Sequence, residues 1–389
     1  MSFSIGPYAL SAPVVLAPMA GVTNAPFRAL CRRYAPGLVY VNEMVMATPV
    51  VQGNPKTHRM ISFDPDEHPR SLQLYGSDPE TMGRAIHQLC DDGRVDHVDL
   101  NFGCPAAKVT RRGGGAAVPA RPELLRAILR AAVGAAAPYG VPVTAKFRMG
   151  LFDDWLTHLR TGEVCVEEGV ASIAMHARTV EQHYSGDARW WAIGELKQHL
   201  ADLGSNVPVL GNGDIWEAHD AVEMMAQTDC DGVVIGRGCL GRPWLFGDLV
   251  DALNGRPVAG SRSLGDVLDV LAAHARLLAD HMGENHAMRD FRKHTGWYMS
   301  GYPIGPEFRR SFSMVASLAE LDDVIAAVLD RCGPDTQIVE GGERIKRGHT
   351  NGPIKVAIPD GWLDGQTRDQ LSTDVSVPDD GHVMAMSGG

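Results

Sequence analysis

A thiol on a basic, glycine-rich segment is the feature of this sequence that points most directly to chemistry. Cys104 lies just beyond an apolar, strand-like run, Val95–Leu100, and Asn101 precedes it by three residues. Lys108 and two arginines follow and lead into a run of three glycines. A cysteine at a strand end on a basic loop is typical of chemistry on an anionic partner. A lone cysteine is, however, more commonly a buried structural residue.

The composition is that of a soluble globular chain. The 389 residues are 44% hydrophobic and 21% charged, and the length suits one large domain and a smaller one. No apolar run is long enough to cross a membrane, and the N-terminus has no basic region followed by an apolar one. Seven scattered cysteines without a C-x-x-C pair favour a reducing compartment and argue against a disulfide framework. We therefore expect a cytoplasmic protein that does not bind a membrane.

The charge distribution leaves a nucleic-acid partner open. A net charge of −11 argues against one, but a local basic patch matters more than the total. Residues 108–121 hold four basic side chains and no acidic one, and residues 289–310 hold five basic side chains against two acids. Each of these stretches is a candidate surface for a polyanion.

The order of apolar runs predicts an α/β protein with a TIM (β/α)8 barrel in residues 1–255. Strand-like runs alternate with longer helix-like stretches, and eight such units in this length are the signature of the fold. A doubly wound sheet is the structural alternative. The predicted strands are Val14–Met19, Leu38–Met44, Arg70–Gly76, His97–Gly103, Val141–Arg148, Ala171–Arg178, Val207–Asp214 and Gly232–Gly238.

Polar clusters recur at the carboxyl ends of nearly all of these strands, which favours the barrel. In a barrel these ends converge on one face, where active sites are built. We therefore expect one site assembled from all parts of residues 1–255. The clusters are Ala17-Pro18-Met19, Asn42-Glu43-Met44, Gln73, Asn101 with Cys104, Lys146 with Arg148, His176 with Arg178, Asn212-Gly213-Asp214 and Gly236-Arg237-Gly238.

The last two clusters indicate a phosphate site. Both end a strand in a glycine-rich turn, and the loops after the seventh and eighth strands are the usual phosphate site of such barrels. Arg237 could add charge-assisted contacts. The stretch from Gly236 to Gly241 also matches G-x-G-x-x-G, but no further parallel strand with a ribose-binding acid follows it, so we do not interpret it as a dinucleotide fingerprint.

Residues 256–333 are predicted to form a small α-helical bundle, because they are helix-periodic and contain no strand candidate. Arg292 and Lys293 lie close to Trp297 and Tyr298, a combination that suits an RNA backbone with stacked bases. A solvated charged face over an aromatic core contact explains the same pattern. The predicted helices are Leu264–Met282, Ala287–Met299 and Glu307–Cys332.

Residues 334–389 form a polar tail rich in Gly, Asp and Pro. Its acids outnumber its basic residues, and only Ile354–Ile358 and Trp362-Leu363 could pack on another element. We expect this tail to be disordered in part and assign no chemistry to it.

The residues predicted to meet at the barrel mouth suit a flavin mononucleotide (FMN). No cluster has metal-ligand spacing, so no metal is expected. Cys104 with His176 could form a nucleophile–base pair, but a cysteine hydrolase needs neither a phosphate site nor cations. FMN would place its phosphate at the glycine-rich turns, Lys146 near N1 and O2, and Gln73 at the polar edge of the ring. A thiol beside a flavin suggests proton delivery during reduction of a polarised C=C bond.

Seven motifs in register resemble those of the tRNA-dihydrouridine synthase family, and the likeness extends from about Ser4 to Cys332. The helical segment with Arg292-Lys293-His294 and Trp297-Tyr298 is similar to the bacterial B-type branch. The motifs are Leu16-Ala17-Pro18-Met19-Ala20-Gly21-Val22-Thr23, Leu72-Gln73-Leu74-Tyr75-Gly76, Asn101-Phe102-Gly103-Cys104-Pro105, Ala145-Lys146-Phe147-Arg148, His176-Ala177-Arg178-Thr179, Asn212-Gly213-Asp214-Ile215 and Ile235-Gly236-Arg237.

The resemblance implies a reaction and a set of contacts. NADPH would reduce bound FMN, the flavin N5 would pass hydride to C6 of a tRNA uridine, and Cys104 would protonate C5. Asn101 and Arg178 would hold the target base, and we expect Lys108, Arg292 and Lys293 to contact the tRNA. We also expect the protein to be a monomer. The resemblance places these residues on the flavin: Ala17, Pro18, Met19, Gln73, Lys146, His176, Asn212, Gly213, Asp214, Gly236 and Arg237.

Two alternatives remain. An FMN barrel of the dihydroorotate dehydrogenase or dihydropyrimidine dehydrogenase kind would act on a free pyrimidine, but it gives no reason for the helical bundle. A protein that only binds RNA or flavin is the second alternative, and the intact Cys104, Lys146 and Arg178 argue against it.

Overall fold

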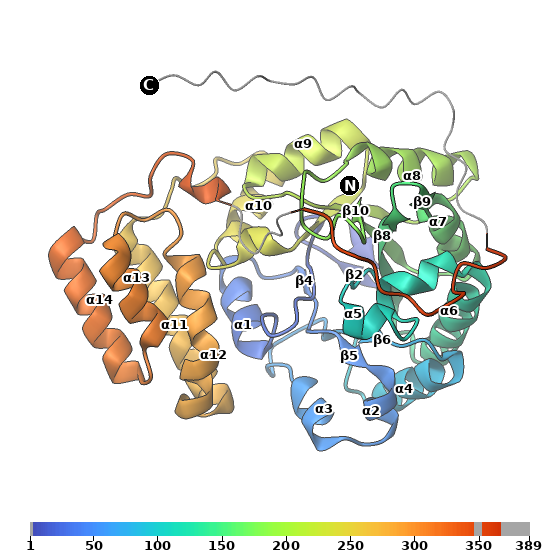
Figure 1. Ribbon diagram of the computed structural model, residues 1–389, viewed down its shortest axis with the longest axis horizontal. Coiled ribbons are helices and arrows are strands. Elements are labelled where there is room, and N and C mark those ends of the chain that lie inside the picture. Colours follow the sequence, from blue (N-terminus) through green and yellow to red (C-terminus); the bar gives the residue numbers. More distant parts are fainter. Residues whose placement is uncertain (1–2, 346–351, 367–389) are drawn as a thin grey trace.

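A closed barrel of parallel strands forms the larger part of the computed structural model, which describes residues 3–345 and 352–366 (Figure 1). The sheet order β4-β3-β12-β11-β10-β8-β7-β6-β5 has the two halves of one strand at its ends. Val41, which follows β4 directly, pairs with Ser71 of β6 in parallel, so the sheet closes on itself. The strands are β3 (Val14–Leu16), β4 (Val39–Tyr40), β5 (Val45–Met46), β6 (Ser71–Tyr75), β7 (His97–Phe102), β8 (Val143–Phe152), β10 (Ser172–Thr179), β11 (Val209–Asn212) and β12 (Gly232–Ile235).

The predicted (β/α)8 barrel is therefore confirmed. The second predicted strand, Leu38–Met44, contains β4, whereas β5 lies just beyond its predicted end. A short hairpin, β1 (Ser4–Ile5) with β2 (Tyr8–Ala9), precedes the barrel, and Ile5 packs with Val15, Val39 and other side chains of the barrel interior. The amino-terminal end of the barrel is thereby filled, and the opposite end is left for a site.

Helices cover the outside of the barrel and form its main core with the outer face of the strands. Several start where the sequence places a cap: the Asp78 side chain accepts from the Thr81 N–H, and Pro79 occupies the first helical position of α4. The helices around the barrel are α1 (Ala25–Tyr34), α4 (Pro79–Asp91), α6 (Pro122–Ala136), α7 (His158–Glu167), α8 (Trp191–Asp202), α9 (Ala218–Thr228) and α10 (Leu245–Leu253).

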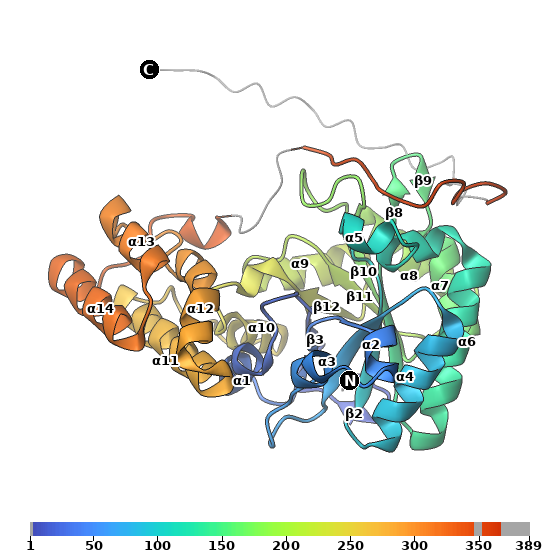
Figure 2. The same ribbon diagram turned by 60° about the horizontal axis from the view of Figure 1, so that its bottom comes forward.

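A bundle of helices with its own hydrophobic core lies beside the barrel (Figures 1 and 2). The prediction of one helix over Glu307–Cys332 is wrong, because the chain breaks between Met314 and Leu318. Ser317 caps the new helix by accepting from the Glu320 N–H. The bundle helices are α11 (Leu264–Met282), α12 (Glu284–Tyr298), α13 (Gly305–Met314) and α14 (Leu318–Cys332).

The chain returns to the barrel after the bundle. Residues 352–366 cross the rim of the barrel near α5 (Ala107–Thr110), β8 and β9 (Trp155–Leu156), as Figure 2 shows. The apolar residues that the sequence singled out, Ile354–Ile358 and Trp362-Leu363, lie in this segment, and four of their side chains pack on the barrel. The expectation of disorder falls in part on residues 346–351 and 367–389, which lie outside the described residues. Within the described residues, no helix has the length and apolar character needed to span a bilayer.

Candidate active site

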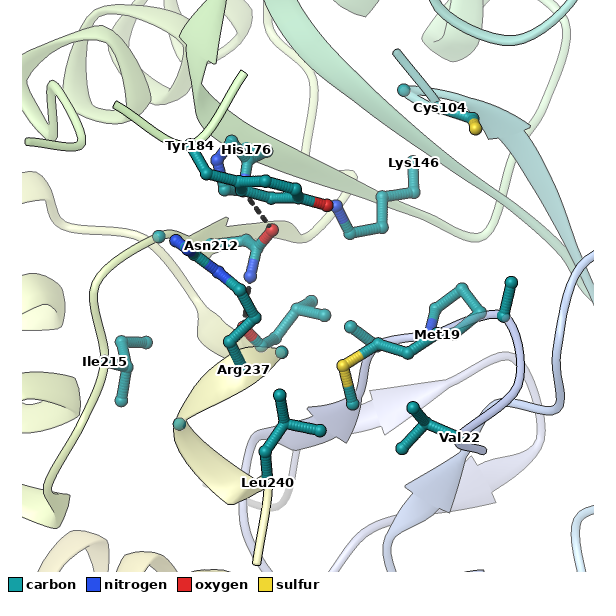
Figure 3. A pocket seen from close by; sticks show the side chains of 18 of the residues that line it. Met19, Val22, Cys104, Lys146, His176, Tyr184, Asn212, Ile215, Arg237 and Leu240 are labelled. Carbon is teal, nitrogen blue, oxygen red and sulfur yellow. Dashed lines mark hydrogen bonds between the residues drawn. The ribbon is translucent and has the colours of Figure 1, made fainter. Parts of the chain in front are cut away.

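A cavity of about 430 Å³ opens at the carboxyl ends of the barrel strands, within the size range of small-ligand sites (Figure 3). Cys104 and Asn101 lie in its wall. The cavity also brings together every residue predicted to contact the cofactor: Ala17, Pro18, Met19, Gln73, Lys146, His176, Asn212, Gly213, Asp214, Gly236 and Arg237.

Cys104 lies on a turn that the side chain of Asn101 organises. The Asn101 carbonyl oxygen accepts hydrogen bonds from the backbone N–H groups of Gly103 at 3.0 Å and Cys104 at 2.8 Å. An asparagine that closes a turn in this way fixes the backbone beyond a strand end. Burial raises the pKa of the Cys104 thiol, although Arg148 and Lys108 oppose this shift. The sulfur therefore carries its proton at neutral pH.

A chain of buried hydrogen bonds anchors this turn in the barrel interior. The Asn101 amide donates to the Gln73 side-chain oxygen at 2.6 Å, and the Gln73 amide donates to Asp99 at 2.6 Å. The Thr144 hydroxyl also donates to Asp99 at 2.6 Å, and burial raises the pKa of Asp99 to about 6. Both ends of the Asn101 amide are thus engaged within the protein.

Lys146 supplies a buried positive charge. Its pKa is lowered to about 8, mainly by burial and then by Arg148, while Asp99 acts in the opposite direction. At neutral pH the ammonium is therefore charged, but it is stabilised less than it would be in water. A ligand that brings negative charge to this point of the cavity would gain from this cation.

Arg148 ties the turn after β7 to the end of β10 and the loop that follows it. Its guanidinium donates to the carbonyl oxygens of Gly103 at 3.0 Å, Thr179 at 2.9 Å and His183 at 2.8 Å. The first of these carbonyls immediately precedes Cys104, so Arg148 and Asn101 both hold this turn. Burial lowers the pKa of Arg148, yet an arginine keeps its charge throughout the neutral range.

His176 is a neutral side chain with one unused nitrogen. Its Nδ1 lies 2.7 Å from the Asn212 side-chain oxygen, and the Asn212 amide donates to the Val234 carbonyl at 2.6 Å. Nδ1 is therefore the donor, and Nε2 is left as an acceptor. Burial lowers the pKa of His176 well below its usual value, with further contributions from nearby cations. Nε2 is buried without a partner in the described residues, so it can accept from a ligand.

Arg178 lies behind the wall of the cavity rather than in it. It is fully buried, and its guanidinium donates to the carbonyl oxygens of Ser185 and Gly186 and to the Asp214 carboxylate. Asp214 has a positive φ of 55° and also accepts from the Ala188 N–H. Arg178 therefore fixes the glycine-rich turn after β11. Its other terminal nitrogen, Nη1, is buried without a partner in the described residues.

Arg237 and Tyr184 form a further part of the cavity wall. The Arg237 guanidinium lies 4.2 Å from the centre of the Tyr184 ring and 5.5 Å from that of Trp216. Burial lowers the pKa of Arg237 to about 10, so it remains charged. The Tyr184 hydroxyl points toward the Lys146 ammonium, as Figure 3 shows. Three cations, Lys146, Arg148 and Arg237, thus face one cavity.

The residues predicted to contact tRNA lie around the cavity rather than in it. Lys108 lines a neighbouring cavity of about 350 Å³ together with Tyr75 and Arg112. Arg292 is half-buried on α12 and donates to the Val315 carbonyl, while Lys293 is exposed and pairs with Asp290. His294 and Tyr298 are buried in the bundle core. For these two residues, the core explanation of the basic and aromatic pattern is therefore the correct one.

Several lining residues received no role from the sequence, among them Arg148, Tyr184 and Trp297. Arg148 stands in the fifth polar strand-end cluster, which is a signal that it was a candidate. Tyr184 lies on the loop that follows β10. Trp297 lies on α12, far from any strand end in the sequence, and only the fold brings it to the cavity. The group of metal-ligand side chains found in residues 3–345 and 352–366, His219 with Asp220 and Glu223, does not line the cavity.

Comparisons with known proteins agree with this site. The family model described as dihydrouridine synthase matches residues 15–332. A probable tRNA-dihydrouridine synthase of Mycobacterium tuberculosis (strain ATCC 25618 / H37Rv) is 47% identical over 99% of this chain and 96% of that protein. The tRNA-dihydrouridine synthase B of Xanthomonas axonopodis pv. citri (strain 306) is 36% identical over 83% of this chain and 93% of that protein.

The solved structure of histamine dehydrogenase from Rhizobium sp. 4-9 is similar at a TM-score of 0.48 and 10% identity, over 85% of this chain and 64% of that chain. A likeness this distant indicates neither a shared activity nor a shared cofactor. The family model and the relatives decide the matter, because the matched residues carry the whole barrel, the cavity and the bundle. This chain belongs to the dihydrouridine synthase family, a family of oxidoreductases that act on CH–CH bonds.

Proposed function

We propose that this protein binds FMN and reduces the C5=C6 bond of uridines in tRNA to 5,6-dihydrouridine, with NADPH as the reductant. The observation that carries the proposal is the position of Cys104. It is a protonated thiol on a fixed turn, in the wall of a cavity that three cations face.

The cavity fits an anionic, planar cofactor. The space beside Gly236 is open, since a Cβ built there would meet only Ala17 at 3.9 Å. Arg237 stands next to this backbone and could bind a phosphate. His176 offers an unused acceptor, and Lys146 offers a cation at the other end of the cavity. The residues present therefore suit the phosphate, the hydrogen-bonding edge and the electron-rich ring of a reduced flavin.

The chain's own residues contribute proton delivery and positioning. When bound, the flavin supplies a two-electron carrier between NADPH and C6 of the uracil ring. Cys104 gives its proton to C5, so that the π bond is replaced by two C–H bonds while NADPH is oxidised. Arg148 and Lys108 stabilise the thiolate that remains, and solvent returns the proton.

Positive charge around the mouth supports an RNA substrate. Lys108, Arg111 and Arg112 are exposed next to the Cys104 turn, and Lys293 is exposed on α12 at the bundle side. A uridine must leave its stack to enter a barrel mouth, which costs roughly a few kcal/mol, and contacts to the flanking phosphates can offset this cost.

The test compares substrates on one enzyme preparation. The purified protein is loaded with FMN and supplied with NADPH and either an unmodified tRNA transcript or free uracil. A separate reaction supplies dihydroorotate with NADP+ as the oxidant, to test the reverse direction. Nucleosides are then analysed by mass spectrometry. We expect dihydrouridine in the tRNA and no conversion of the free bases. Turnover of a free base without any dihydrouridine in tRNA would favour the dihydroorotate dehydrogenase type of activity.

A further inference from the structure

Residues 352–366, which we call the strap, pack against the segment that carries Cys104. The Ile354 N–H donates to the Glu181 carbonyl at 2.8 Å, which fixes one end of the strap on the loop after β10. Its apolar side chains Val356, Ile358, Trp362 and Leu363 pack on a small cluster built from Ala116, Ala120, Leu151 and Val180. Figure 2 shows the strap passing over α5 and beside β8.

Trp362 makes the most specific contacts of the strap. Its indole N–H donates to the Ala117 carbonyl at 2.8 Å. Its ring covers Gly113 so closely that a Cβ built on this glycine would lie 2.4 Å from a ring carbon. The Arg121 guanidinium lies 4.9 Å from the ring centre. Trp362 therefore holds the outer side of the glycine-rich loop at three points.

The inner side of the same loop touches Cys104. The Ala116 N–H donates to the Cys104 carbonyl at 3.2 Å. A Cβ built on Gly115 would meet this carbonyl at 2.9 Å and the Cys104 side chain at 3.3 Å. Loop residues 113–117 are thus clamped between Trp362 on one side and Cys104 on the other, and Trp362 itself does not line the cavity.

We propose that Trp362 is a positioning residue, which holds the loop of residues 113–117 so that the Cys104 thiol faces the cavity. Three successive glycines give this loop more conformational freedom to lose than any other residue type would. The hydrogen bonds that Gly113 and Gly114 donate to Thr110 and Val109 restrict this freedom from within, and the strap adds an external contact through Trp362. The strap lies beyond residues 15–332, which match the family model, so membership of the family does not assign this role.

The proposal rests on the proposed function only where Cys104 is called an acid. Its structural claim can be tested without flavin, NADPH or tRNA, by the reactivity of the thiol. A loop that opens more often exposes Cys104 more often, and the rate of alkylation follows the open population.

The experiment measures alkylation of Cys104 by iodoacetamide in the full chain, followed by mass spectrometry of the peptide that contains this residue. Trp362→Ala is compared with Trp362→Phe, which keeps a ring over Gly113, and with Val339→Ala as a control. Val339 is an exposed apolar residue of the same tail outside the strap. Hydrogen exchange at the Ala116 amide, which bonds the Cys104 carbonyl, provides a second measurement.

We expect Trp362→Ala to raise the alkylation rate on the order of tenfold, because losing a contact of about 1.4 kcal/mol shifts the open population by that factor. Trp362→Phe should lie closer to the wild type, and Val339→Ala should equal it. Hydrogen exchange at the Ala116 amide should be fastest in Trp362→Ala and slower in Trp362→Phe, and Val339→Ala should exchange at the wild-type rate. The melting temperature of each variant is measured first. If that of Trp362→Ala shows that it folds poorly, Trp362→Leu is compared with the wild type instead.

An alkylation rate in Trp362→Ala within twofold of the wild type, with unchanged exchange at Ala116, would overturn the positioning role. Activity then separates this claim from the proposed function. If thiol reactivity changes as expected but neither the wild type nor any variant makes dihydrouridine, the strap holds the loop and the proposed reaction is wrong. If both hold, Trp362→Ala should reduce flavin with NADPH at the wild-type rate and transfer to tRNA more slowly.

Discussion

At the scale of single residues, the cavity joins a neutral acid to side chains that are positively charged at neutral pH. Cys104 keeps its proton because burial raises its pKa, whereas Lys146 keeps its charge although burial lowers its pKa to about 8. His176 stays neutral because burial and the surrounding cations lower its pKa. Because the pKa values of these groups shift by different amounts and in different directions, an acid, a cation and a neutral hydrogen-bonding group occupy one site at the same pH.

We expect flavin binding to depend on pH through the protonation of Lys146. A bound anion stabilises the ammonium, so binding raises the pKa of Lys146 above its value of about 8 in the free protein. Affinity is therefore constant below pH 8 and falls as the pH rises above it, where the free protein loses this proton. Titration of FMN fluorescence between pH 7 and 9 measures the effect. Lys146→Arg should give a flat profile, and the same decline in this variant would show that another group is responsible.

Lys146 also affects the stability of the fold. Its pKa is lowered from 10.5 to about 8, so the unfolded chain binds more protons than the folded one between these values. The sign follows directly: the unfolding free energy of the flavin-free protein gains a rising contribution from Lys146 as the pH increases from 8 toward 10.5. Urea denaturation of wild type and Lys146→Met at pH 7.5 and 9 should show a smaller increase in the variant. Equal increases in both proteins would contradict this assignment.

At the scale of elements, helix α12 connects the bundle to the cavity. Trp297 lines the cavity, and Lys293 approaches the loop after β3 so closely that a Cβ on Gly21 would lie 3.2 Å from its ammonium. The Glu43 carboxylate accepts from the Gly21 N–H on this loop. Helix α12 therefore carries both Lys293, which we propose to bind RNA, and Trp297, which lines the cavity of the barrel.

Gly241 tests this connection, because a Cβ there would lie 2.5 Å from the backbone of Trp297. Gly255 has nearly the same positive φ, 68° against 69°, but open space around it. Gly255→Ala should cost about 1–2 kcal/mol from its backbone conformation alone. Gly241→Ala should cost a further ~1–3 kcal/mol from overpacking and weaken tRNA binding. Chemical denaturation and tRNA titration measure both effects, and equal values for the two variants would show that α12 does not depend on this contact.

At the scale of the whole molecule, an acidic protein is expected to bind a polyanion through local basic surfaces. Lys293→Gln should weaken tRNA binding and reduce the slope of log K against log salt by about 0.7–0.9, the contribution of one phosphate contact. Arg276→Gln is the matched control, because Arg276 is an exposed cation of the bundle that pairs with Asp322. Binding measured between 50 and about 200 mM salt decides the matter. A slope unchanged in Lys293→Gln would assign Lys293 to a solvated face.

Much of the barrel could be predicted from the sequence, because β-branched runs and strand-end polar clusters are local signals. The predicted cofactor residues come together for this reason: some follow the ends of β3, β11 and β12, and Gln73, Lys146 and His176 lie within β6, β8 and β10. Contacts between distant segments gave no such signal. Arg148 joins the turn after β7 to the end of β10 and the loop beyond it, and Trp297 reaches the cavity only because the bundle folds back on the barrel. Ser317 with Glu320 was a local capping signal for the break between α13 and α14.

The strap shows the same limit. The apolar residues Ile354–Ile358 and Trp362-Leu363 could be recognised as able to pack, but no pattern in the sequence indicated their partner. That partner, the loop of residues 113–117, lies more than two hundred residues earlier in the chain. The pairing of Trp362 with Gly113 depends on shape and on contacts to Ala117 and Arg121, which composition does not record.

The transfer of reducing equivalents to tRNA by Cys104→Ala tests the central claim most directly. The flavin-loaded variant is reduced by NADPH without oxygen and mixed with unmodified tRNA, and dihydrouridine is counted by mass spectrometry. We expect flavin binding and reduction by NADPH to match the wild type, while formation of dihydrouridine slows by roughly 10²–10⁴-fold, the usual contribution of a general acid. Dihydrouridine formed by Cys104→Ala at a rate near that of the wild type would contradict the role of this thiol.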